Sequence, residues 1–196
     1  MGLPIKKLLV ASNSNDVLTR FFETGVMKKR KTIKTLSPSM DIQVSSNFER
    51  LLYDYSKKDT CLINKYFSNL KTKDIFTIDK KKLEQMLKLF QGFRLSDKET
   101  KECIKKIYKD HNIIIDPHTA VGIEAGRKNR NDKELNIYLS TAHHGKFIDT
   151  VNNSLKENIK PPKKLRDILK KNEFYKVLSN NIFDIEKYVI SKNWVK

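Results

Sequence analysis

An apolar segment that leads through a polar turn into a helix is the feature that most constrains this fold. Ile5–Ser12 is apolar enough for a central strand of a sheet, and Asn13–Asp16 follows as a turn and helix cap. Val17–Thr24 has apolar residues at helical spacing, and Gly25 follows as a helix stop. Such a unit is typical of α/β proteins with a parallel sheet.

The middle of the chain is predicted to be mainly helical. Thr60–Leu70 and Asp79–Gln91 have apolar residues at helical spacing, and Gly92 is expected to end the second helix. Ser96–Glu99 resembles a capping box that opens a third helix. We therefore expect residues 48–111 to form a helical insert on an α/β body.

The last part of the chain returns to an alternating pattern. A small-residue helix is predicted over Thr119–Gly126, a strand over Leu135–Leu139 and helical structure over His143–Leu155. Phe174–Leu178 is predicted as a short last strand. Asn181–Ser191 is predicted as a terminal helix with an inward apolar face.

These elements divide the chain into an α/β sheet segment, a helical insert and a C-terminal α/β segment. The segments cover residues 1–47, 48–111 and 112–196. Only two or three strands are convincing, and an independent doubly wound sheet needs more. The predicted fold class is therefore α/β, with part of a sheet whose edge has to be covered.

The formal net charge of +17 permits binding to nucleic acid or another anionic surface. Lysine supplies most of this charge, and arginine occurs at only seven positions. Arginine is the preferred residue for bidentate contacts to phosphates and bases, so the composition indicates an AT-rich coding bias instead. No specific nucleic-acid partner is expected, and a basic binding module stays open as an alternative.

Two features of the sequence bear on its compartment. No apolar run reaches the ~20 residues of a membrane span, and Met1–Val10 lacks the apolar core and cleavage site of a signal peptide. Cys61 and Cys103 lack metal-ligand spacing and are too few for a disulfide framework. We therefore expect a cytoplasmic protein without a membrane or metal partner.

Four polar clusters lie where a predicted strand or turn ends, which is where open α/β sheets bind ligands. They are Asn13–Asp16, the run from Ser37 to Arg50, Asp116–Gly122 and Ser140–Phe147. Each has a simpler structural explanation, such as helix capping by Ser46–Asn47. His143 and His144 are adjacent on a predicted helix and do not face one another, so no metal site is predicted there.

Taken together and in order, these clusters resemble threonine synthases of the subgroup found in fungi and many bacteria. The run from Ser37 to Arg50 is the most specific part of the match. The matching segments are Leu3–Leu8, Asn13–Leu18, Thr35–Ile42, Ser45–Leu52, Asp116–Gly122 and Ser140–His143.

The resemblance implies the type II fold of pyridoxal-phosphate enzymes, of which this chain would be the C-terminal part of the large domain with a helical insert. It also implies threonine biosynthesis by a lyase that converts O-phosphohomoserine and water to L-threonine and phosphate. In this family pyridoxal phosphate serves as the electron sink, and a lysine forms the Schiff base.

The resemblance implies that Thr141 binds the pyridine nitrogen of the cofactor, with Ser140 beside it. It places a further set of residues in segments that line or support the substrate site: Asn13, Asn15, Asp16, Ser46, Asn47, Arg50 and His118. One departure is that His144 and Gly145 stand where the family usually has proline and alanine, which loosens the backbone there.

The family's Schiff-base lysine and its glycine-rich phosphate loop lie upstream of the matched region. No lysine of this chain lies in a similar motif, so no catalytic residue is assigned and activity of the chain by itself stays uncertain. We expect a truncated chain that is inactive and does not bind the cofactor alone. The alternative is one subunit of a split threonine synthase, with a separate N-terminal half as its partner.

Overall fold

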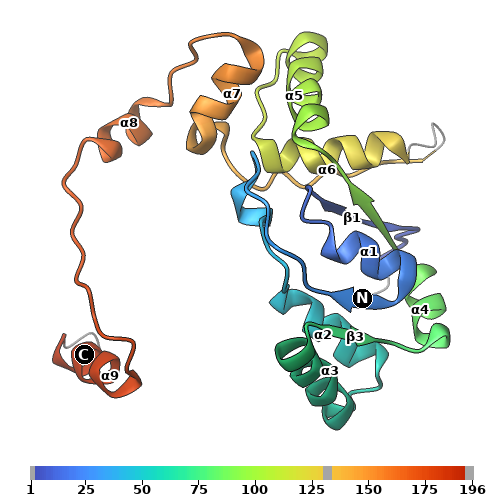
Figure 1. Ribbon diagram of the computed structural model, residues 1–196. Coiled ribbons are helices and arrows are strands. Elements are labelled where there is room, and N and C mark those ends of the chain that lie inside the picture. The colour runs from blue at the N-terminus through green and yellow to red at the C-terminus, as the bar shows by residue number, and fades with distance from the viewer. Residues whose placement is uncertain (1–2, 130–133, 193–196) are drawn as a thin grey trace. The chain divides into compact units, whose positions relative to one another are not determined.

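The computed structural model describes residues 3–129 and 134–192. The chain divides into two compact units, Met1–Pro161 and Pro162–Lys196. The elements of the first unit in chain order are β1 (Leu8–Ser12), α1 (Val17–Thr24), β2 (Val26–Lys28), the 3-10 helix η1 (Pro38–Met40), α2 (Ser46–Tyr55), α3 (Thr60–Lys73), β3 (Ile75–Thr77), α4 (Lys80–Leu87), β4 (Phe90–Arg94), α5 (Asp97–His111), α6 (Pro117–Lys128), the 3-10 helix η2 (His144–Phe147) and α7 (Ile148–Leu155), as shown in Figure 1. The second unit contains α8 (Lys163–Leu169) and α9 (Ile182–Ser191).

The predicted strand–turn–helix unit at the start of the chain is confirmed. β1 lies within the predicted strand, α1 has the predicted bounds, and Gly25 ends the helix in the left-handed conformation with φ 73°. Gly25 N–H donates to the carbonyl of Phe21 at 2.7 Å, as a helix stop should. The same residue leads into β2, which pairs with β3 in an antiparallel sheet.

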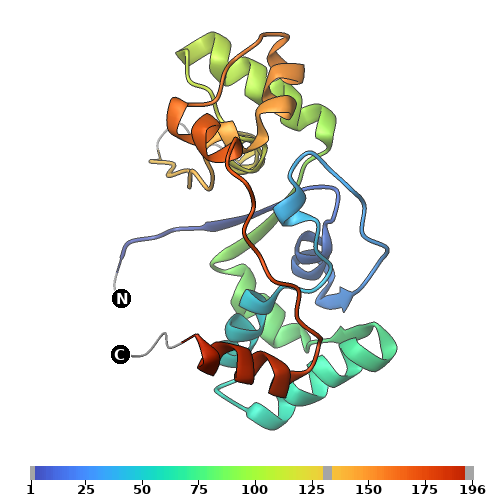
Figure 2. The same ribbon diagram turned by 90° about the vertical axis from the view of Figure 1, so that its left-hand side faces the viewer.

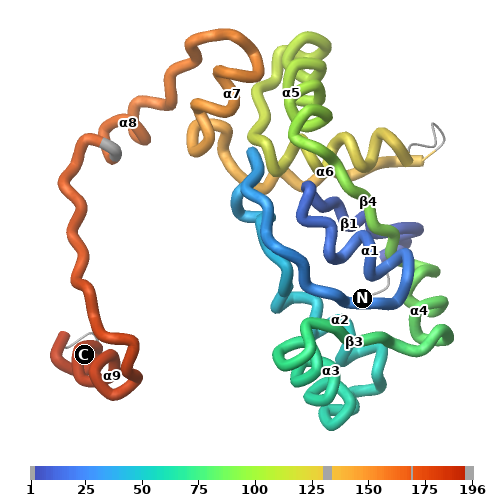
Figure 3. The backbone as a smooth tube through the Cα atoms, viewed as in Figure 1, coloured from blue at the N-terminus to red at the C-terminus, as the bar shows by residue number. Residues whose placement is uncertain are grey.

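β1 pairs with β4 in a parallel sheet, and Figure 3 shows the two strands side by side. The register runs from Leu8 opposite Phe90 to Ser12 opposite Arg94. The prediction that the helix over Asp79–Gln91 continues to Gly92 was therefore wrong, because α4 ends at Leu87 and Gly92 lies in the middle of β4.

Gly92 allows helix α1 to lie directly on strand β4. A Cβ atom added at Gly92 would lie 2.7 Å from Thr19 Cα, which is too close for a real contact. Thr19 Oγ1 also donates to the carbonyl of Phe93 at 2.9 Å. An isolated glycine in an apolar run can mark either a helix end or the close approach of another backbone, and here it marks the second.

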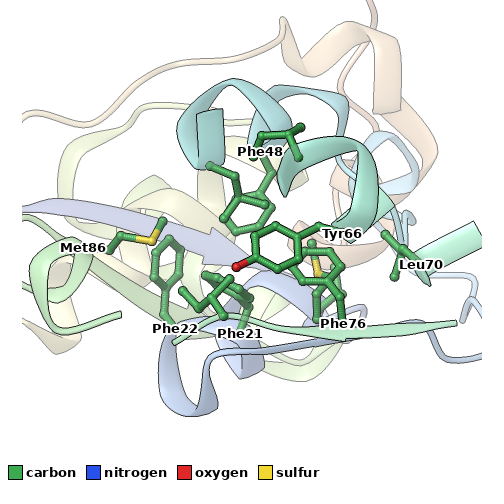
Figure 4. Close-up of a cluster of buried hydrophobic side chains, with 12 residues drawn as sticks. Phe21, Phe22, Phe48, Tyr66, Leu70, Phe76 and Met86 are labelled. Carbon is green, nitrogen blue, oxygen red and sulfur yellow. The ribbon is translucent and has the colours of Figure 1, made fainter. Parts of the chain in front are cut away.

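An aromatic cluster joins α1 to α2, α3 and β3, and Figure 4 shows its side chains in contact. The rings of Phe21 and Phe48 meet edge to face with centroids 4.5 Å apart, and Tyr66 stacks on Phe76 at 4.9 Å. Edge-to-face and offset stacked rings add to the stabilisation from buried apolar area. This cluster therefore anchors the helices of residues 46–73 to the start of the chain.

A second group of helices covers the sheet near its carboxyl end, and Figures 1 and 2 both show α5, α6 and α7 together. The predicted capping box of α5 is confirmed, because Ser96 Oγ accepts from Glu99 N–H and Glu99 accepts from Ser96 N–H. Lys128 of α6 also forms an ion pair with Glu99. The hydrogen bond from Lys128, followed by that from Ser96 N–H, lowers the pKa of Glu99 to about 2.

Two predicted strands do not form among the described residues. Leu135–Leu139 and Phe174–Leu178 both lack regular secondary structure. α9 forms with Asn181 as its N-cap, but Ile182 and Ile190 are each 69% exposed, so the prediction of an inward apolar face was wrong. Strands require a neighbouring strand to pair with, and within the described residues the only strand pairs are β1 with β4 and β2 with β3.

The predicted division of the chain at residues 47 and 111 stays a prediction. The segment 48–111 contributes β4 to the sheet with β1, in addition to its helices. Among residues 3–129 and 134–192, no helix is both long and apolar enough to cross a lipid bilayer.

Replacement of Gly92 by alanine is expected to lower the free energy of unfolding by about 2 kcal/mol, because the added methyl group overlaps the α1 backbone. The matched control is Gly122→Ala in helix α6, where a Cβ would meet no atom within 4 Å. That control should raise the free energy of unfolding by about 0.5–1 kcal/mol. Urea unfolding of both variants measures these changes, and equal effects would contradict the packing described here.

Glu99→Gln is expected to destabilise the chain by about 1 kcal/mol at neutral pH, because it weakens the capping box and removes the charge opposite Lys128. The pKa of Glu99 falls from 4.5 to about 2 on folding, so its contribution is present above about pH 4.5. It is lost as the pH falls from 4.5 towards 2, and the difference from the parent chain should disappear there. Glu102→Gln, at an exposed position of the same helix, controls for general charge effects.

Candidate functional site

The carboxyl ends of β1 and β4 lie beside one another because the two strands are parallel. Leu95 N–H donates to the carbonyl of Ser12 at 2.9 Å, which extends the pairing to the end of both strands. The turn that follows β1 starts with Asn13, which is 1% exposed. This edge is where ligands bind in open α/β sheets, so the polar residues around it form the candidate site.

The side chain of Asn13 is the centre of a buried hydrogen-bond network. Its Nδ2 lies 2.7 Å from Thr35 Oγ1, 2.8 Å from Asp41 Oδ1 and 2.9 Å from Ser37 Oγ. Its Oδ1 accepts from the backbone N–H of Asn15 at 2.8 Å. The amide of Asn13 is therefore used within the chain, where it holds the loop over residues 33–41 against the end of β1.

Asn15 and Asp41 complete this network. Asn15 Nδ2 donates to the carbonyl of Ile33, and its Oδ1 accepts from Ile33 N–H, both at 2.8 Å. Asp41 accepts from Thr35 N–H at 3.0 Å and from Thr35 Oγ1 at 2.6 Å. Sequence reasoning did not select Asp41 as a site residue, although it closes the turn over Ser37–Asp41 that carried the family resemblance.

Asp16 lies between helix α1 and the end of strand β4. Its carboxylate accepts from Arg20 Nε at 2.8 Å and lies 3.6 Å from a guanidinium nitrogen of Arg94. The predicted helix cap is confirmed in its position, because Asp16 is the N-cap of α1, but its side chain makes no capping hydrogen bond to the helix. The carboxylate is mostly buried and binds two arginines instead.

His118 connects helix α6 to the loop that carries Ser39. Ser39 N–H donates to His118 Nε2 at 3.2 Å, so the ring proton resides on Nδ1 and is donated to Asp116 Oδ1 at 2.9 Å. The ring also lies against Phe147, with centroids 4.6 Å apart. His118 is 8% exposed, and it therefore supports the site from inside the chain.

Asp116 caps α6, and its hydrogen bonds connect His118 with Thr119, which in turn binds Thr141. Its carboxylate accepts from the N–H groups of His118 and Thr119 at 2.9 and 3.3 Å, and from the hydroxyl of Thr119. Thr119 Oγ1 in turn accepts from Thr141 N–H at 3.1 Å. Sequence reasoning placed Asp116 and Thr119 in a matching segment but did not identify them as the anchor of Thr141.

Ser140 and Thr141 are exposed at the end of this network. Thr141 Oγ1 lies 3.5 Å from Thr119 Oγ1, and its hydroxyl proton can rotate towards a ligand. A neutral hydroxyl of this kind is a suitable donor to the unprotonated nitrogen of a pyridine ring. The residues present therefore fit the ring-nitrogen side of pyridoxal phosphate.

The rings of the two neighbouring histidines lie against one another with centroids 4.2 Å apart, so the prediction that they do not face one another was wrong. His143 Nδ1 accepts from Gly145 N–H at 3.0 Å and so caps η2. Burial, followed by the nearby His143, lowers the pKa of His144. In the part of the chain that the structure describes, no group of three or more potential metal ligands gathers.

The remaining candidates, Ser46, Asn47 and Arg50, lie on helix α2. Ser45 is the N-cap of α2, so the prediction that Ser46 and Asn47 precede the helix was wrong by one to two positions. Arg50 donates to Asn47 Oδ1 at 2.8 Å. No hydrogen bond within the described residues links these three side chains to the network between Asn13 and Thr141.

Ser46 and Arg50 line a cavity of about 270 Å³ between α2 and α3. The other residues around the cavity are Glu49, Tyr53, Thr60, Ile63 and Asn64. The structure thus places Asn13 and Asn15 in one hydrogen-bond network and His118 and Thr141 in another, and both networks hold the loop over residues 33–41. Ser46 and Arg50 lie at a separate cavity.

The chain has clear relatives among known proteins. It matches the family model described as "Threonine synthase, C-terminal" over residues 119–189. The threonine synthase of Saccharomyces cerevisiae is 44% identical over 173 residues, which cover 79% of this chain and 34% of the yeast protein. That of Pseudomonas aeruginosa is 34% identical over 191 residues, which cover 96% of this chain and 41% of the relative.

A solved threonine synthase structure contains the same fold as this chain. The crystal structure of PLP-bound threonine synthase from Brucella melitensis aligns with a TM-score of 0.87 at 35% identity. The alignment covers 100% of this chain and 42% of the Brucella chain. This chain therefore spans well under half the length of these relatives.

Asp41→Ala is expected to lower the free energy of unfolding by about 3 kcal/mol, because it removes four hydrogen bonds, with the amides of Asn13 and Asn15 and with the N–H and hydroxyl of Thr35. The backbone N–H of Thr35 should also exchange faster with solvent. Asp54→Ala, at an exposed position of α2, should change stability by no more than about 0.5 kcal/mol. Urea unfolding with amide hydrogen exchange checks this prediction, and unchanged exchange at Thr35 would contradict it.

Proposed function

Because the chain belongs to the threonine synthase family, we propose that it is the C-terminal portion of a threonine synthase, which converts O-phosphohomoserine and water to L-threonine and phosphate. Its α/β structure is part of the type II fold of pyridoxal-phosphate enzymes. The observation that carries the proposal is the hydrogen-bond path from Asp116 through Thr119 to Thr141 at the carboxyl edge of the sheet.

In this proposal, Thr141 holds the ring nitrogen of pyridoxal phosphate, with Ser140 beside it. The bound cofactor would supply an electron sink for a lyase reaction of threonine biosynthesis. Thr141 keeps its position because its backbone N–H is bound by Thr119, which Asp116 fixes at the first turn of α6. The hydroxyl of Thr141 remains exposed for a ligand.

The other candidate residues divide into two groups. Asn13, Asn15 and His118 act as positioning residues, because their polar atoms bind other parts of the chain. Ser46 and Arg50 line the α2 cavity, where a guanidinium group and the first turn of a helix suit the phosphate of the substrate.

We further propose that the residues of this chain are inactive by themselves, because the Schiff-base lysine of the family lies outside the segment that they match. A lysine with this role is usually buried, since burial lowers its pKa and leaves a neutral amine. Every lysine among the described residues is exposed or only half-buried. The free thiols of Cys61 and Cys103 suit the cytoplasmic location that we propose for the protein.

The purified chain mixed with pyridoxal phosphate is expected to show no cofactor-bound absorbance and no lysine labelled after borohydride reduction. Co-expression with the part of the Saccharomyces cerevisiae enzyme that precedes the aligned segment should restore phosphate release from O-phosphohomoserine. In that assembly Thr141→Val should lower the rate by about tenfold or more, because one hydrogen bond to the ring is lost.

Thr72→Val is the control for this measurement, since Thr72 lies on the exposed face of α3, and its rate should match that of the parent assembly. Labelling of one lysine in the chain alone would overturn the proposed inactivity. A complex that forms but releases no phosphate would overturn the proposed function.

A further inference from the structure

A cavity of about 360 Å³ lies between helices α5 and α6, which Figures 1 and 2 show together. Apolar side chains form one part of its wall, and charged or titratable side chains form the rest. The lining residues are Lys106, Ile107, Asp110 and His111 of α5, Ile123 and Arg127 of α6, and Tyr138. The volume falls in the range of small-molecule sites, which measure about 300–1,000 Å³.

The apolar part of the wall is held in place by the packing of the two helices. Ile107 and Ile123 are half-buried and pack against the buried residues Cys103, Ile104, Ile115 and Ala120. The ring of Tyr138 lies directly on α6, because a Cβ added at Gly126 would collide with it. A wall that is ordered before a ligand arrives lowers the entropic cost of binding.

Two cations of the cavity lie near one another although they come from different helices. Burial, followed by the carboxylate of Glu124, raises the pKa of the Cys103 thiol to about 11, and Arg127 and Lys106 oppose this rise. Both cations are therefore close to the same buried thiol. A guanidinium nitrogen of Arg127 lies 3.8 Å from Glu124, which is beyond hydrogen-bond distance, so its donors are available to a ligand.

The cavity also has one acidic side chain. Asp110 lies four residues after Lys106 on α5, a spacing that favours an ion pair. Within the described residues, however, neither of these two side chains forms an ion pair or a hydrogen bond. The cavity thus offers both a positive and a negative group beside an apolar wall.

We infer that this cavity is a binding site for a free α-amino acid with an apolar side chain. The carboxylate of such a ligand suits the guanidinium of Arg127 and the ammonium of Lys106, and its own ammonium suits Asp110. A ligand with only one kind of charge would meet a group of like charge in the cavity, which disfavours it. The site goes beyond the proposed function and does not depend on it, since none of its lining residues takes part in the networks around Asn13 and Thr141.

The test titrates the isotope-labelled chain with L-leucine and with two analogues that each lack one charge. Isocaproate has the same apolar group without the ammonium, and isoamylamine has it without the carboxylate. L-Leucine should shift the amide resonances of the lining residues on α5 and α6. Each analogue should bind about tenfold more weakly, because it loses one charge-assisted interaction and keeps a group of like charge nearby.

Substitutions assign the two charges of the ligand to their partners. Arg127→Gln should weaken the binding of L-leucine by about tenfold, and Asp110→Asn should weaken it by about fivefold. Asp110→Asn should not weaken the binding of isocaproate, which has no ammonium group. The matched controls Lys105→Gln and Glu102→Gln make the same changes of charge at exposed positions of α5 outside the cavity. They should change the dissociation constant by less than about twofold.

The absence of shifts up to the solubility limit of L-leucine, or shifts confined to other parts of the chain, would overturn the inference. Equal binding of L-leucine and its analogues would refute an amino-acid site, as would equal effects of the cavity variants and their controls. Thermal unfolding of each variant checks that it is folded. Asp110→Asn decides the test if Arg127→Gln unfolds the chain, since it removes no ion pair or hydrogen bond within the described residues.

Discussion

The buried carboxylate of Asp116 is the group on which the arrangement of the site depends. It is 1% exposed, and hydrogen bonds from the first turn of α6 and from the imidazole of His118 compensate for its lost hydration. The partial positive charge at the start of α6 stabilises it further. Through His118 the carboxylate orients the loop with Ser39, and through Thr119 it fixes Thr141, so one buried charge aligns two distant parts of the sequence.

The parts of the fold that the sequence predicted are those determined by neighbouring residues. The unit from β1 to Gly25 and the capping box at Ser96 depend on side chains a few positions apart, and both were found. Strand β4 was missed because a glycine is needed at position 92 for the close approach of Thr19, a residue far away in the chain. The strand expected at Leu135–Leu139 requires a neighbour that the described residues do not provide.

The candidate site shows the same division. The family resemblance implied a cofactor contact for Thr141 and placed Asn13 and His118 in segments around the site, but it could not separate exposed groups from groups that are bonded within the chain. The structure makes this separation, because the amide of Asn13 and the ring of His118 are already bonded within the chain. The structural role of Asp41 was not predicted, because its carboxylate accepts four hydrogen bonds from residues that lie close together only in the folded chain.

The exposed apolar side chains of Leu135, Ile137 and Leu139 also affect how much of the chain can accumulate in solution. Exposed apolar segments are substrates for chaperones and proteases, and they promote aggregation when the concentration rises. Burial of these three side chains against another surface would protect the chain from both fates.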